Sequence, residues 1–495
     1  MLRPLNSISK SLQTCASLVG ADIVNNFNGA DISGISQSSG DVVEGDLFIA
    51  LPGANFHGAS FASDAIANGA VAVLTNKAGA ALIKGVPILI CENPRRAAGV
   101  LSTWFYSEPM RDLYSIGVTG TNGKTTVTTL LHQIMQVTGR QSGLIGTIET
   151  RIGSDVFSSK RTTPEAPELQ ALCAVMRERH SRNLIMEVSS HAITLDRIRG
   201  SHFSVVGFTN LSQDHLDFHK SMEDYFQAKS ALFAFEYADL SVINIDDVYG
   251  ARLAATTELP VVSLSRSNVK ANWHFVKIVR DNFGASIAIR GPGGVLIEGT
   301  TVLLGGFNYD NLLMSIALAV ESGVDPIDIA AVLPQLHGAA GRLESVKLGQ
   351  AFTALVDYAH SPDAVTRVLE TAHEIASGKV IAVLGCGGDR DASKRSIMGR
   401  ALQDGADIAI FTSDNPRSER PEDILGQMVL DIDVVSPSQI ILDRASAIRT
   451  AVTHAMPGDV VLVLGKGHEL GQEIAGVVHK FDDRVELARA IENRP

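Results

Sequence analysis

The chain of 495 residues is too long for one ordinary hydrophobic core, and its length suggests about three domains. Its net charge of −12, from 42 Lys and Arg against 54 Asp and Glu, argues against a general nucleic-acid-binding protein but leaves room for a local basic pocket. Four scattered cysteines without a CxxC pair, no N-terminal signal segment and no long apolar run favour a reduced, soluble, cytoplasmic protein that does not insert into membranes.

Short β-branched runs alternate with helix-like stretches along nearly the whole chain, which is typical of parallel α/β sheets. We divide the chain into three blocks at 1–109, 110–340 and 341–495, with a Gly- and Ala-rich segment at 337–344 interpreted as a hinge. The predicted fold class is α/β with three domains. A central, P-loop-type, mostly parallel sheet is expected between an N-terminal α/β domain and a C-terminal Rossmann-like α/β domain.

Polar stretches follow the apolar runs that we predict to be strands. The expected strands lie at 46–51, 70–74, 86–91, 114–118, 184–186, 205–208, 380–384, 408–411 and 460–464. In the second block the polar stretches are TGTNGKTT, EVSSH and TNLSQDHLDFHK, and in the third they are GCGGDRD, TSDNPRSE and GKGHE. Ligands of parallel sheets bind beyond the carboxyl ends of the strands. We therefore expect each set of polar stretches to share one edge of its sheet.

The stretch GTNGKTT at 120–126 lies between an expected strand and a helix predicted over 125–137. Glycines let backbone N–H groups approach phosphate oxygens, and a helix N-terminus adds positive potential. Lys124 is placed to reach the β- and γ-phosphates, and the Thr125 hydroxyl to bind Mg²⁺. The strict phosphate-loop pattern needs a glycine where this chain has Val118, so a glycine-rich turn with an incidental lysine is the alternative. The pattern favours use of ATP or GTP.

Acidic and imidazole groups follow the next strands. Glu187 ends a buried-looking strand, where a carboxylate is costly unless it is paired or metal-bound. His215, Asp217 and His219 crowd one loop, which fits either a mixed metal site or a solvated polar loop. Lys229, taken by itself, is expected to be an ordinary surface lysine of a helix.

The polar stretches of the third block carry charged side chains of both signs. Arg417 follows a proline that stiffens its loop, and a guanidinium binds a carboxylate with two parallel hydrogen bonds. Glu469 suits an ammonium. The alternative is a plain proline turn in which Arg417 pairs with Glu419 or Glu422.

Together GTNGKTT, EVSSH, TNLSQDHLDFH, AKSALF, GGFNYDN, VDYAHSPD and GKGHE resemble the Mur ligase family, the ATP-dependent amino-acid ligases of peptidoglycan precursor synthesis. Within the family the chain looks like the MurE-type branch, which adds the third residue. The resemblance implies transfer of a phosphoryl group from ATP to the D-Glu side-chain carboxylate of UDP-N-acetylmuramoyl-L-Ala-D-Glu. An amine of meso-2,6-diaminopimelate then displaces the phosphate. DNPR resembles the loop of diaminopimelate-adding members, and we expect a monomer that uses ATP, Mg²⁺ and these small molecules.

The resemblance also implies a role for individual residues. ATP is assigned to Gly120, Thr121, Asn122, Gly123, Lys124, Thr125, Thr126, Asn308, Asn311 and Arg342, with Asp357, Tyr358 and His360 closing on the nucleotide. Magnesium is assigned to Thr125, Glu187, His215 and Lys229, the last as a CO₂-derived carbamate, with Lys124, Lys229 and His215 as the catalytic residues. Diaminopimelate is assigned to Arg390, Asp414, Asn415, Pro416, Arg417, Gly465 and Glu469.

The first block resembles the family's uridine-binding domain. The UDP-muramoyl dipeptide is assigned to Ser39, Ala54, Asn55, Phe56, Thr162, Thr163, Ser189 and Arg197. The chain departs from many relatives at Ser38-Ser39-Gly40, where they have Asp-Ser-Arg, and from some at Leu195, where they have a polar residue.

Other functions remain open from the sequence. A lysine-adding Mur ligase is the nearest, and a folylpolyglutamate-synthetase-like enzyme is more distant because the first block argues against it. A P-loop nucleotide-binding regulator is an alternative from a different class. It gives no role to GCGGDRD, DNPR and GKGHE.

Overall fold

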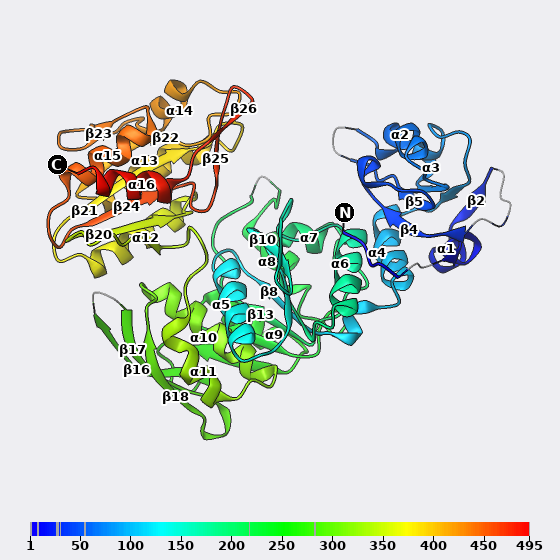
Figure 1. Cartoon of the computed structure of the whole chain (residues 1–495), viewed down its shortest axis with the longest axis horizontal. Coiled ribbons are helices and arrows are strands. Elements are labelled where there is room, and N and C mark those ends of the chain that lie inside the picture. The colour runs from blue at the N-terminus through cyan, green and yellow to red at the C-terminus, as the bar shows by residue number, and fades with distance from the viewer. Residues whose placement is uncertain are drawn as a thin grey trace.

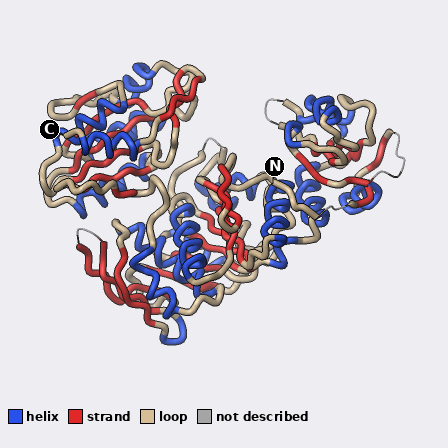
Figure 2. The backbone as a smooth tube through the Cα atoms, viewed as in Figure 1, coloured by secondary structure: helices blue, strands red, loops and turns tan. Residues whose placement is uncertain are grey.

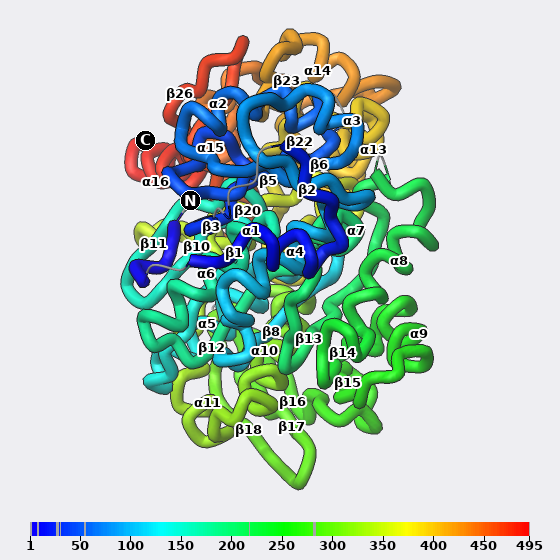
Figure 3. The backbone as a smooth tube through the Cα atoms, turned by 90° about the vertical axis from the view of Figure 1, so that its right-hand side faces the viewer, coloured from blue at the N-terminus to red at the C-terminus, as the bar shows by residue number. Residues whose placement is uncertain are grey.

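The computed structural model describes residues 2–6, 9–25, 29, 31–53, 56–216, 218–281 and 284–494. The backbone forms three lobes in chain order, with the N-terminal and C-terminal lobes at opposite ends of the central one (Figure 1). A view turned by 90° shows that both outer lobes stand on the same side of the central lobe (Figure 3). None of the described helices is long and apolar enough to cross a membrane.

The N-terminal lobe is built on a five-stranded sheet in the order β2-β7-β6-β5-β4. Its strands are β1 (Lys10–Ser11), β2 (Asp22–Val24), β3 (Asp31–Ile32), β4 (Gly34–Ser36), β5 (Asp46–Ile49), β6 (Ala72–Thr75) and β7 (Ile88–Ile90), and its helices are α1 (Leu12–Val19), α2 (Ala62–Ala67), α3 (Lys77–Ala80) and α4 (Pro94–Phe105). The core of this lobe includes Ala171 and Ala174 from the next lobe, so the two lobes share packed surface.

The central lobe contains an eleven-stranded sheet in the order β11-β10-β9-β12-β8-β13-β14-β15-β16-β17-β18. The strands from β9 to β16 in that order are parallel, and both ends of the sheet are antiparallel. The strands are β8 (Tyr114–Thr119), β9 (Ser142–Ile145), β10 (Glu149–Ile152), β11 (Asp155–Ser158), β12 (Asn183–Glu187), β13 (Val205–Phe208), β14 (Ser241–Asn244), β15 (Val261–Ser265), β16 (Trp273–Asp281), β17 (Gly284–Arg290) and β18 (Leu296–Thr301).

Helices cover both faces of this sheet (Figure 2). They are α5 (Lys124–Val137), α6 (Ala166–Glu178), α7 (Ser190–Thr194), α8 (Met222–Ser230), α9 (Val248–Thr256), α10 (Gly306–Glu321) and α11 (Pro326–Val332). Buried side chains of α5 and α10 form one apolar cluster with the sheet, and those of α6, α8 and α9 form the other.

The C-terminal lobe has a six-stranded sheet in the order β19-β20-β24-β21-β22-β23, parallel except for β19. Its strands are β19 (Glu344–Ser345), β20 (Thr353–Asp357), β21 (Val380–Cys386), β22 (Ile408–Ser413), β23 (Gln439–Ile440) and β24 (Val460–Leu464), and β25 (Gly471–Ile474) and β26 (Val477–Lys480) form a separate hairpin. The helices are α12 (Pro362–Ile375), α13 (Ser393–Gly405), α14 (Pro421–Met428), α15 (Arg444–His454) and α16 (Asp483–Glu492).

The strand pairing confirms the expected sharing of sheet edges. β12 and β13 both pair in parallel with β8, so the polar stretches after the three strands leave the same edge of the central sheet. β22 and β24 both pair in parallel with β21, which places the three stretches of the C-terminal lobe together. The three-domain α/β prediction is confirmed.

Candidate active site

The phosphate loop has the backbone that its glycines permit. β8 ends at Thr119, and Gly120 and Gly123 take φ values of 147° and 89° before α5 begins at Lys124. A Cβ at Gly123 would lie 2.3 Å from Asn311 Oδ1. The Lys124 ammonium donates to the carbonyl oxygens of Gly120 and Thr121, at 2.9 Å each, and burial lowers its pKa. The lysine therefore lies over the loop, at the position from which it can reach a phosphate.

Glu187 is fully buried at the end of β12, with 0 % of its surface exposed. Its Oε2 accepts hydrogen bonds from the Thr125 and Thr147 hydroxyls at 3.0 Å, and its Oε1 accepts one from the Thr147 N–H at 2.8 Å. A buried carboxylate with hydroxyl neighbours fits the oxygen ligands that Mg²⁺ prefers. No group of three or more His, Cys, Asp or Glu is placed to hold a metal within the described part of the chain, so phosphate oxygens and water would have to complete the coordination.

The structure corrects the expectation that Lys229 is a surface lysine. Its side chain is 1 % exposed, and its ammonium donates to Gly120 O at 2.8 Å and lies 4.7 Å from the centre of the Tyr225 ring. Burial and the nearby Lys124 ammonium hold its pKa well below the usual value. The helical spacing was a usable signal, because Tyr225 and Phe226 lie four and three positions before Lys229, share its face of α8 and are buried with it.

The loop after β13 brings His215 close to other aromatic groups. His215 has a φ of 54°, its Nε2 lies 3.5 Å from Asp214 Oδ2, and its ring centre lies 4.9 Å from that of His191. His219 is buried and shares a hydrogen bond of 2.9 Å with Ser190 Oγ. Asp217 lies outside the described residues. The expected crowding of His215 and His219 is present, and His191 joins them.

A cavity of about 480 Å³ lies between the central and C-terminal lobes. Many of the residues that the sequence analysis assigned to a ligand line this cavity. They are Thr121, Asn122, Gly123, Lys124, Thr125, Thr126, Thr162, Glu187, Ser189, His215, Asn311, Arg342, Asp357, Tyr358 and His360. Asn308 lies behind this wall, where its amide oxygen accepts a hydrogen bond from Asn311 Nδ2 at 3.3 Å. Residues more than 200 positions apart in the sequence therefore line the same cavity.

The sequence analysis missed several lining residues. They include Thr147, Asn210, Asp214, Asp246, Arg266, Asp310 and Arg367. Burial raises the pKa of Asp310 to about 6, and Arg266 Nε lies 3.6 Å from its carboxylate. Asp310 stands inside GGFNYDN between the two asparagines, so its position in the motif was a usable signal. Thr147 and Arg266 belong to no motif that the sequence analysis used.

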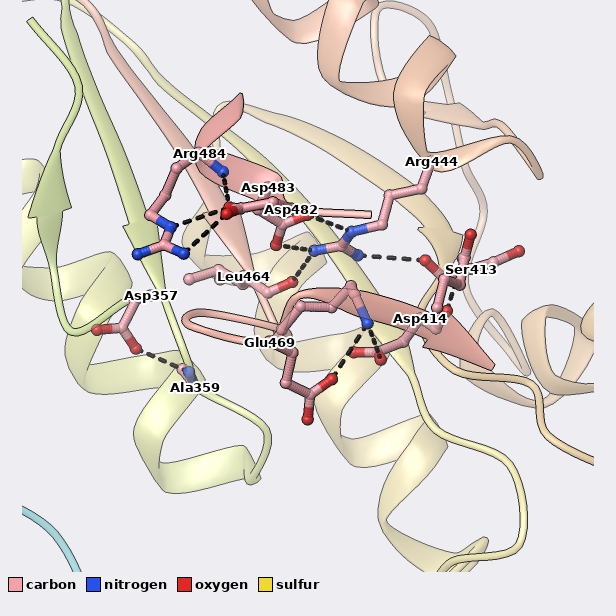
Figure 4. Close-up of polar contacts among 12 residues, drawn as sticks. Asp357, Ala359, Ser413, Asp414, Arg444, Leu464, Glu469, Asp482, Asp483 and Arg484 are labelled. Carbon is pink, nitrogen blue, oxygen red and sulfur yellow. Dashed lines mark hydrogen bonds and ion pairs between the residues drawn. The ribbon is translucent and has the colours of Figure 1, made fainter. Parts of the chain in front are cut away.

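The C-terminal lobe supplies a cation to this cavity. Arg342 lies 4.7 Å above the Tyr358 ring, and its buried Nε has no hydrogen-bond partner among the described residues. Asp357 is buried and accepts a hydrogen bond of 2.7 Å from the Leu343 N–H and one of 2.7 Å from the Ala359 N–H, the second of which is drawn in Figure 4. The Asp357 carboxylate thus fixes the segment on which Arg342 stands, and the vacant donor of Arg342 suits an anion.

The residues assigned to the muramoyl dipeptide form a second polar cluster. Thr163 Oγ1 donates to Glu187 O at 2.9 Å and accepts from the Ser189 N–H at 3.1 Å, and Thr162 Oγ1 lies 3.0 Å from Thr147 Oγ1. Arg197 Nε lies 2.9 Å from Glu165 Oε1. Glu187 and Thr147 connect this cluster to the candidate magnesium ligands Thr125 and Glu187.

The N-terminal residues lie apart from the cavity. Ser39 begins a 3-10 turn, its neighbour Gln37 donates to Glu165 at 3.2 Å across the lobe boundary, and Phe56 is 73 % exposed. Ala54 and Asn55 lie outside the described residues. The Gln37 contact places the Ser39 turn next to the Arg197 cluster.

Hydrogen bonds connect DNPR to the other two polar stretches of the C-terminal lobe. Asn415 Nδ2 donates to Glu469 Oε2 at 2.7 Å, and the Gly388 N–H donates to Asn415 O at 2.8 Å. Arg417, with a φ of 54°, donates from Nη1 to Gly388 O at 2.5 Å. Arg390 is exposed on the same edge, and Gly465 has a φ of 110°. The predicted amino-acid residues thus lie at one edge of the lobe.

The alternative salt-bridge partners of Arg417 are wrong. Arg417 Nε lies 3.5 Å from Glu473 Oε2, on the β25–β26 hairpin. Glu419 instead pairs with the buried Arg395 at 2.7 Å, and Glu422 with Arg420 at 3.8 Å. No local pattern indicated that β25 would lie beside DNPR, because that contact depends on tertiary packing.

The chain matches three family models along most of its length. They are described as the Mur ligase family, catalytic domain (residues 31–106), the Mur ligase middle domain (118–319) and the Mur ligase, glutamate ligase domain (341–467). A UDP-N-acetylmuramoyl-L-alanyl-D-glutamate–2,6-diaminopimelate ligase of Streptomyces coelicolor is 48% identical over 470 residues, covering 93% of each chain.

Solved structures agree with these matches. A structure titled as a UDP-N-acetylmuramoyl-L-alanyl-D-glutamate–2,6-diaminopimelate ligase is 32% identical, with a TM-score of 0.69 over 98% of this chain and 99% of that one. MurF ligase from Thermotoga maritima in complex with ADP is 18% identical, with a TM-score of 0.63 over 93% and 97%, and shows the same fold. On these matches, the chain belongs to the Mur ligase family.

Proposed function

We propose that the protein is an ATP-dependent ligase that joins meso-2,6-diaminopimelate to the D-Glu side-chain carboxylate of UDP-N-acetylmuramoyl-L-Ala-D-Glu in peptidoglycan precursor synthesis. The observation that carries the proposal is the cavity in which the phosphate loop, Glu187 and Arg342 face one another across two lobes. The diaminopimelate-type loop DNPR stands at the strand ends of the second of these lobes. The names of the relatives point to the same reaction.

The first step brings two anions together. An oxygen of the D-Glu carboxylate attacks the γ-phosphorus of ATP, the bond from this phosphorus to the β-γ bridging oxygen breaks, and ADP leaves. Lys124 from the central lobe and Arg342 from the C-terminal lobe both line the cavity and can neutralise the charge of the transferred phosphoryl group. The loop N–H groups before α5 hold the phosphates in place.

Thr125 and Glu187 have the oxygen donors for Mg²⁺, which when bound would screen the phosphates. Lys229 is suited to become a carbamate. Its lowered pKa favours the neutral amine, whose nitrogen attacks the carbon of CO₂ and loses a proton to water. The carbamate would turn a buried cation beside Lys124 into an anion with two oxygen donors.

In the second step the amine of the amino acid attacks the acyl carbon. The amine loses a proton, the acyl–oxygen bond breaks and inorganic phosphate leaves. Water would compete for the acyl phosphate, so closure of the C-terminal lobe over the cavity has a clear chemical purpose. Arg417 and Arg390 are suited to the far carboxylate of diaminopimelate, and Glu469 and Asp414 to its far ammonium.

An assay of ADP release tests the proposal. We expect release only when both UDP-N-acetylmuramoyl-L-Ala-D-Glu and meso-diaminopimelate are present, with L-lysine a poor replacement. Lys124→Ala should lower kcat at least about 100-fold, because it removes a cation from the transferring phosphoryl group. Preference for lysine would reject the substrate while keeping the ligase. Slow ATP hydrolysis that ignores both co-substrates would favour the nucleotide-binding regulator.

A further inference from the structure

A fully buried lysine lies beneath the proposed amino-acid loops. β24 ends at Leu464, Gly465 turns the chain with a φ of 110°, and the Lys466 side chain then points inward with 0 % of its surface exposed. A Cβ at Gly465 would come within 2.6 Å of Asp414 Oδ2, so the turn leaves space only for a hydrogen. The turn therefore brings GKGHE against DNPR and directs Lys466 between them.

The contacts of Lys466 are all with residues assigned to the amino acid. Its Nζ lies 3.1 Å from Asn415 Oδ1, 3.1 Å from Glu469 Oε2 and 3.8 Å from Asp414 Oδ1 (Figure 4 draws Asp414 and Glu469). The same Asn415 Oδ1 also accepts a hydrogen bond from the Glu473 N–H at 2.9 Å, so two donors hold this amide in place. Lys466 is thus a bridge between the two loops.

A neighbouring arginine already has its own partners. Arg444 is also fully buried, and its guanidinium forms two hydrogen bonds with Asp483 at 2.6 and 2.7 Å (Figure 4). It also donates to Ser413 O and Leu464 O, at the ends of β22 and β24. Arg444 is therefore paired with Asp483 and acts on Asp414 through its charge, whereas Lys466 lies within ion-pair distance of both Asp414 and Glu469.

Lys466 partly neutralises the carboxylates of Asp414 and Glu469, which are the groups proposed for the far ammonium. These carboxylates therefore attract an ammonium less strongly than they would without Lys466. A far end that also carries a carboxylate, as in diaminopimelate, can add pairing with Arg417 and Arg390, whereas lysine cannot.

We propose that Lys466 is a positioning residue for the amino-acid step and that its charge makes the pocket favour a zwitterionic far end over an ammonium alone. This inference rests on the proposed function. Lys466 acts through Asn415 and Glu469, which it holds in place, and does not itself touch the substrate. Burial raises the pKa of Asp414, and the Arg444 and Lys466 charges oppose that rise, which keeps the carboxylate available for an ammonium.

The test compares Lys466→Met, which has similar length and no charge, with Arg489→Met as a control. Arg489 belongs to helix α16 of the same lobe, is exposed and pairs with Glu486 at 2.6 Å. For Lys466→Met we expect the KM for diaminopimelate to rise about tenfold or more, because charged hydrogen bonds to Asn415 and Glu469 are lost. The KM for ATP should stay within about twofold, and the ratio of kcat/KM for diaminopimelate over lysine should fall about tenfold. Arg489→Met should leave all three unchanged.

A double variant separates positioning from general stability. In a Glu469→Gln background, Lys466→Met should raise the KM for diaminopimelate less than about threefold, because one of its partners is already altered. If Lys466→Met does not fold, Lys466→Gln keeps two N–H donors, removes the charge and serves for the ratio measurement. An unchanged ratio and KM, or an equal rise in the KM for ATP, would overturn the inference. Wild-type protein without diaminopimelate-dependent ADP release would instead overturn the proposed function.

Discussion

At the scale of single residues, two buried lysines lie in opposite surroundings. Lys466 contacts Glu469 and lies near Asp414, whereas Lys229 contacts a backbone carbonyl and lies near the cation Lys124. The Lys466 side chain is therefore placed for ionic pairing, whereas burial and the Lys124 charge lower the pKa of Lys229 and favour its neutral amine. The same side chain is thus suited to structural pairing at one site and to covalent chemistry with CO₂ at the other.

The carbamate proposed for Lys229 can be tested directly. Protein equilibrated with ¹³C-labelled CO₂ should give a carbamate carbon signal in ¹³C NMR, and Lys229→Met should lack it, because that side chain has no nitrogen. The variant should lose at least about 100-fold in kcat. ATP should still bind within about threefold of wild type, since Lys124 and the loop glycines are intact. A signal of equal size in Lys229→Met would place the carbamate elsewhere.

Lys229 and Arg417 show how far local sequence patterns could predict the structure. Strand ends and the phosphate loop could be predicted because period, glycine spacing and polar stretches are local properties, and β8, β12 and α5 appear where they were expected. The contact of Lys229 with the phosphate loop could not, because it depends on where α8 docks against that loop. The pairing of Arg417 with Glu473 depends in the same way on the position of β25. Local sequence patterns could not predict the contacts between elements that are far apart in the sequence.

At the scale of elements, helix α5 begins and ends next to glycines with positive φ. Gly123 precedes it at 89° and Gly139 follows it at 73°. The two positions differ in their surroundings, because a Cβ at Gly139 would meet nothing within 4 Å, whereas one at Gly123 would meet the Asn311 side chain. The glycine at the end of the helix is needed for its backbone alone, and the one at its start also leaves room for a cavity residue.

Alanine at each position separates these two needs. Gly139→Ala should cost about 1 kcal/mol of unfolding free energy and leave the KM for ATP unchanged. Gly123→Ala should carry the same backbone cost and also raise the KM for ATP about tenfold or more, because it displaces Asn311 and distorts the loop. Chemical denaturation and steady-state kinetics measure the two effects. Equal KM values in the two variants would show that the contact with Asn311 does not matter for ATP.

At the scale of the whole molecule, the three lobes differ in how much apolar core they share with a neighbouring lobe. The apolar core of the N-terminal lobe includes Ala171 and Ala174 of α6, so it shares packing with the central lobe. The two apolar clusters of the C-terminal lobe take their buried residues from between 343 and 491, and the central lobe adds the partly buried Leu304 and Phe307 against one of them. The C-terminal lobe therefore shares less buried core than the N-terminal lobe and is the unit best able to move and to unfold by itself, as the proposed closure over the cavity requires.

Calorimetry should show this division. We expect two unfolding transitions, one for the C-terminal lobe and one for the other two lobes together. A non-hydrolysable ATP analogue at about 100 times its Kd should stabilise the protein by about 2.7 kcal/mol and raise the transition of the central lobe. The transition of the C-terminal lobe should rise with it, because Arg342, Tyr358 and His360 line the same cavity as Lys124. Lys124→Ala should remove most of both shifts.

A single transition whose calorimetric and van't Hoff enthalpies agree would mean that the three lobes unfold as one unit. Lobe closure would then have to occur without independent stability of the C-terminal lobe.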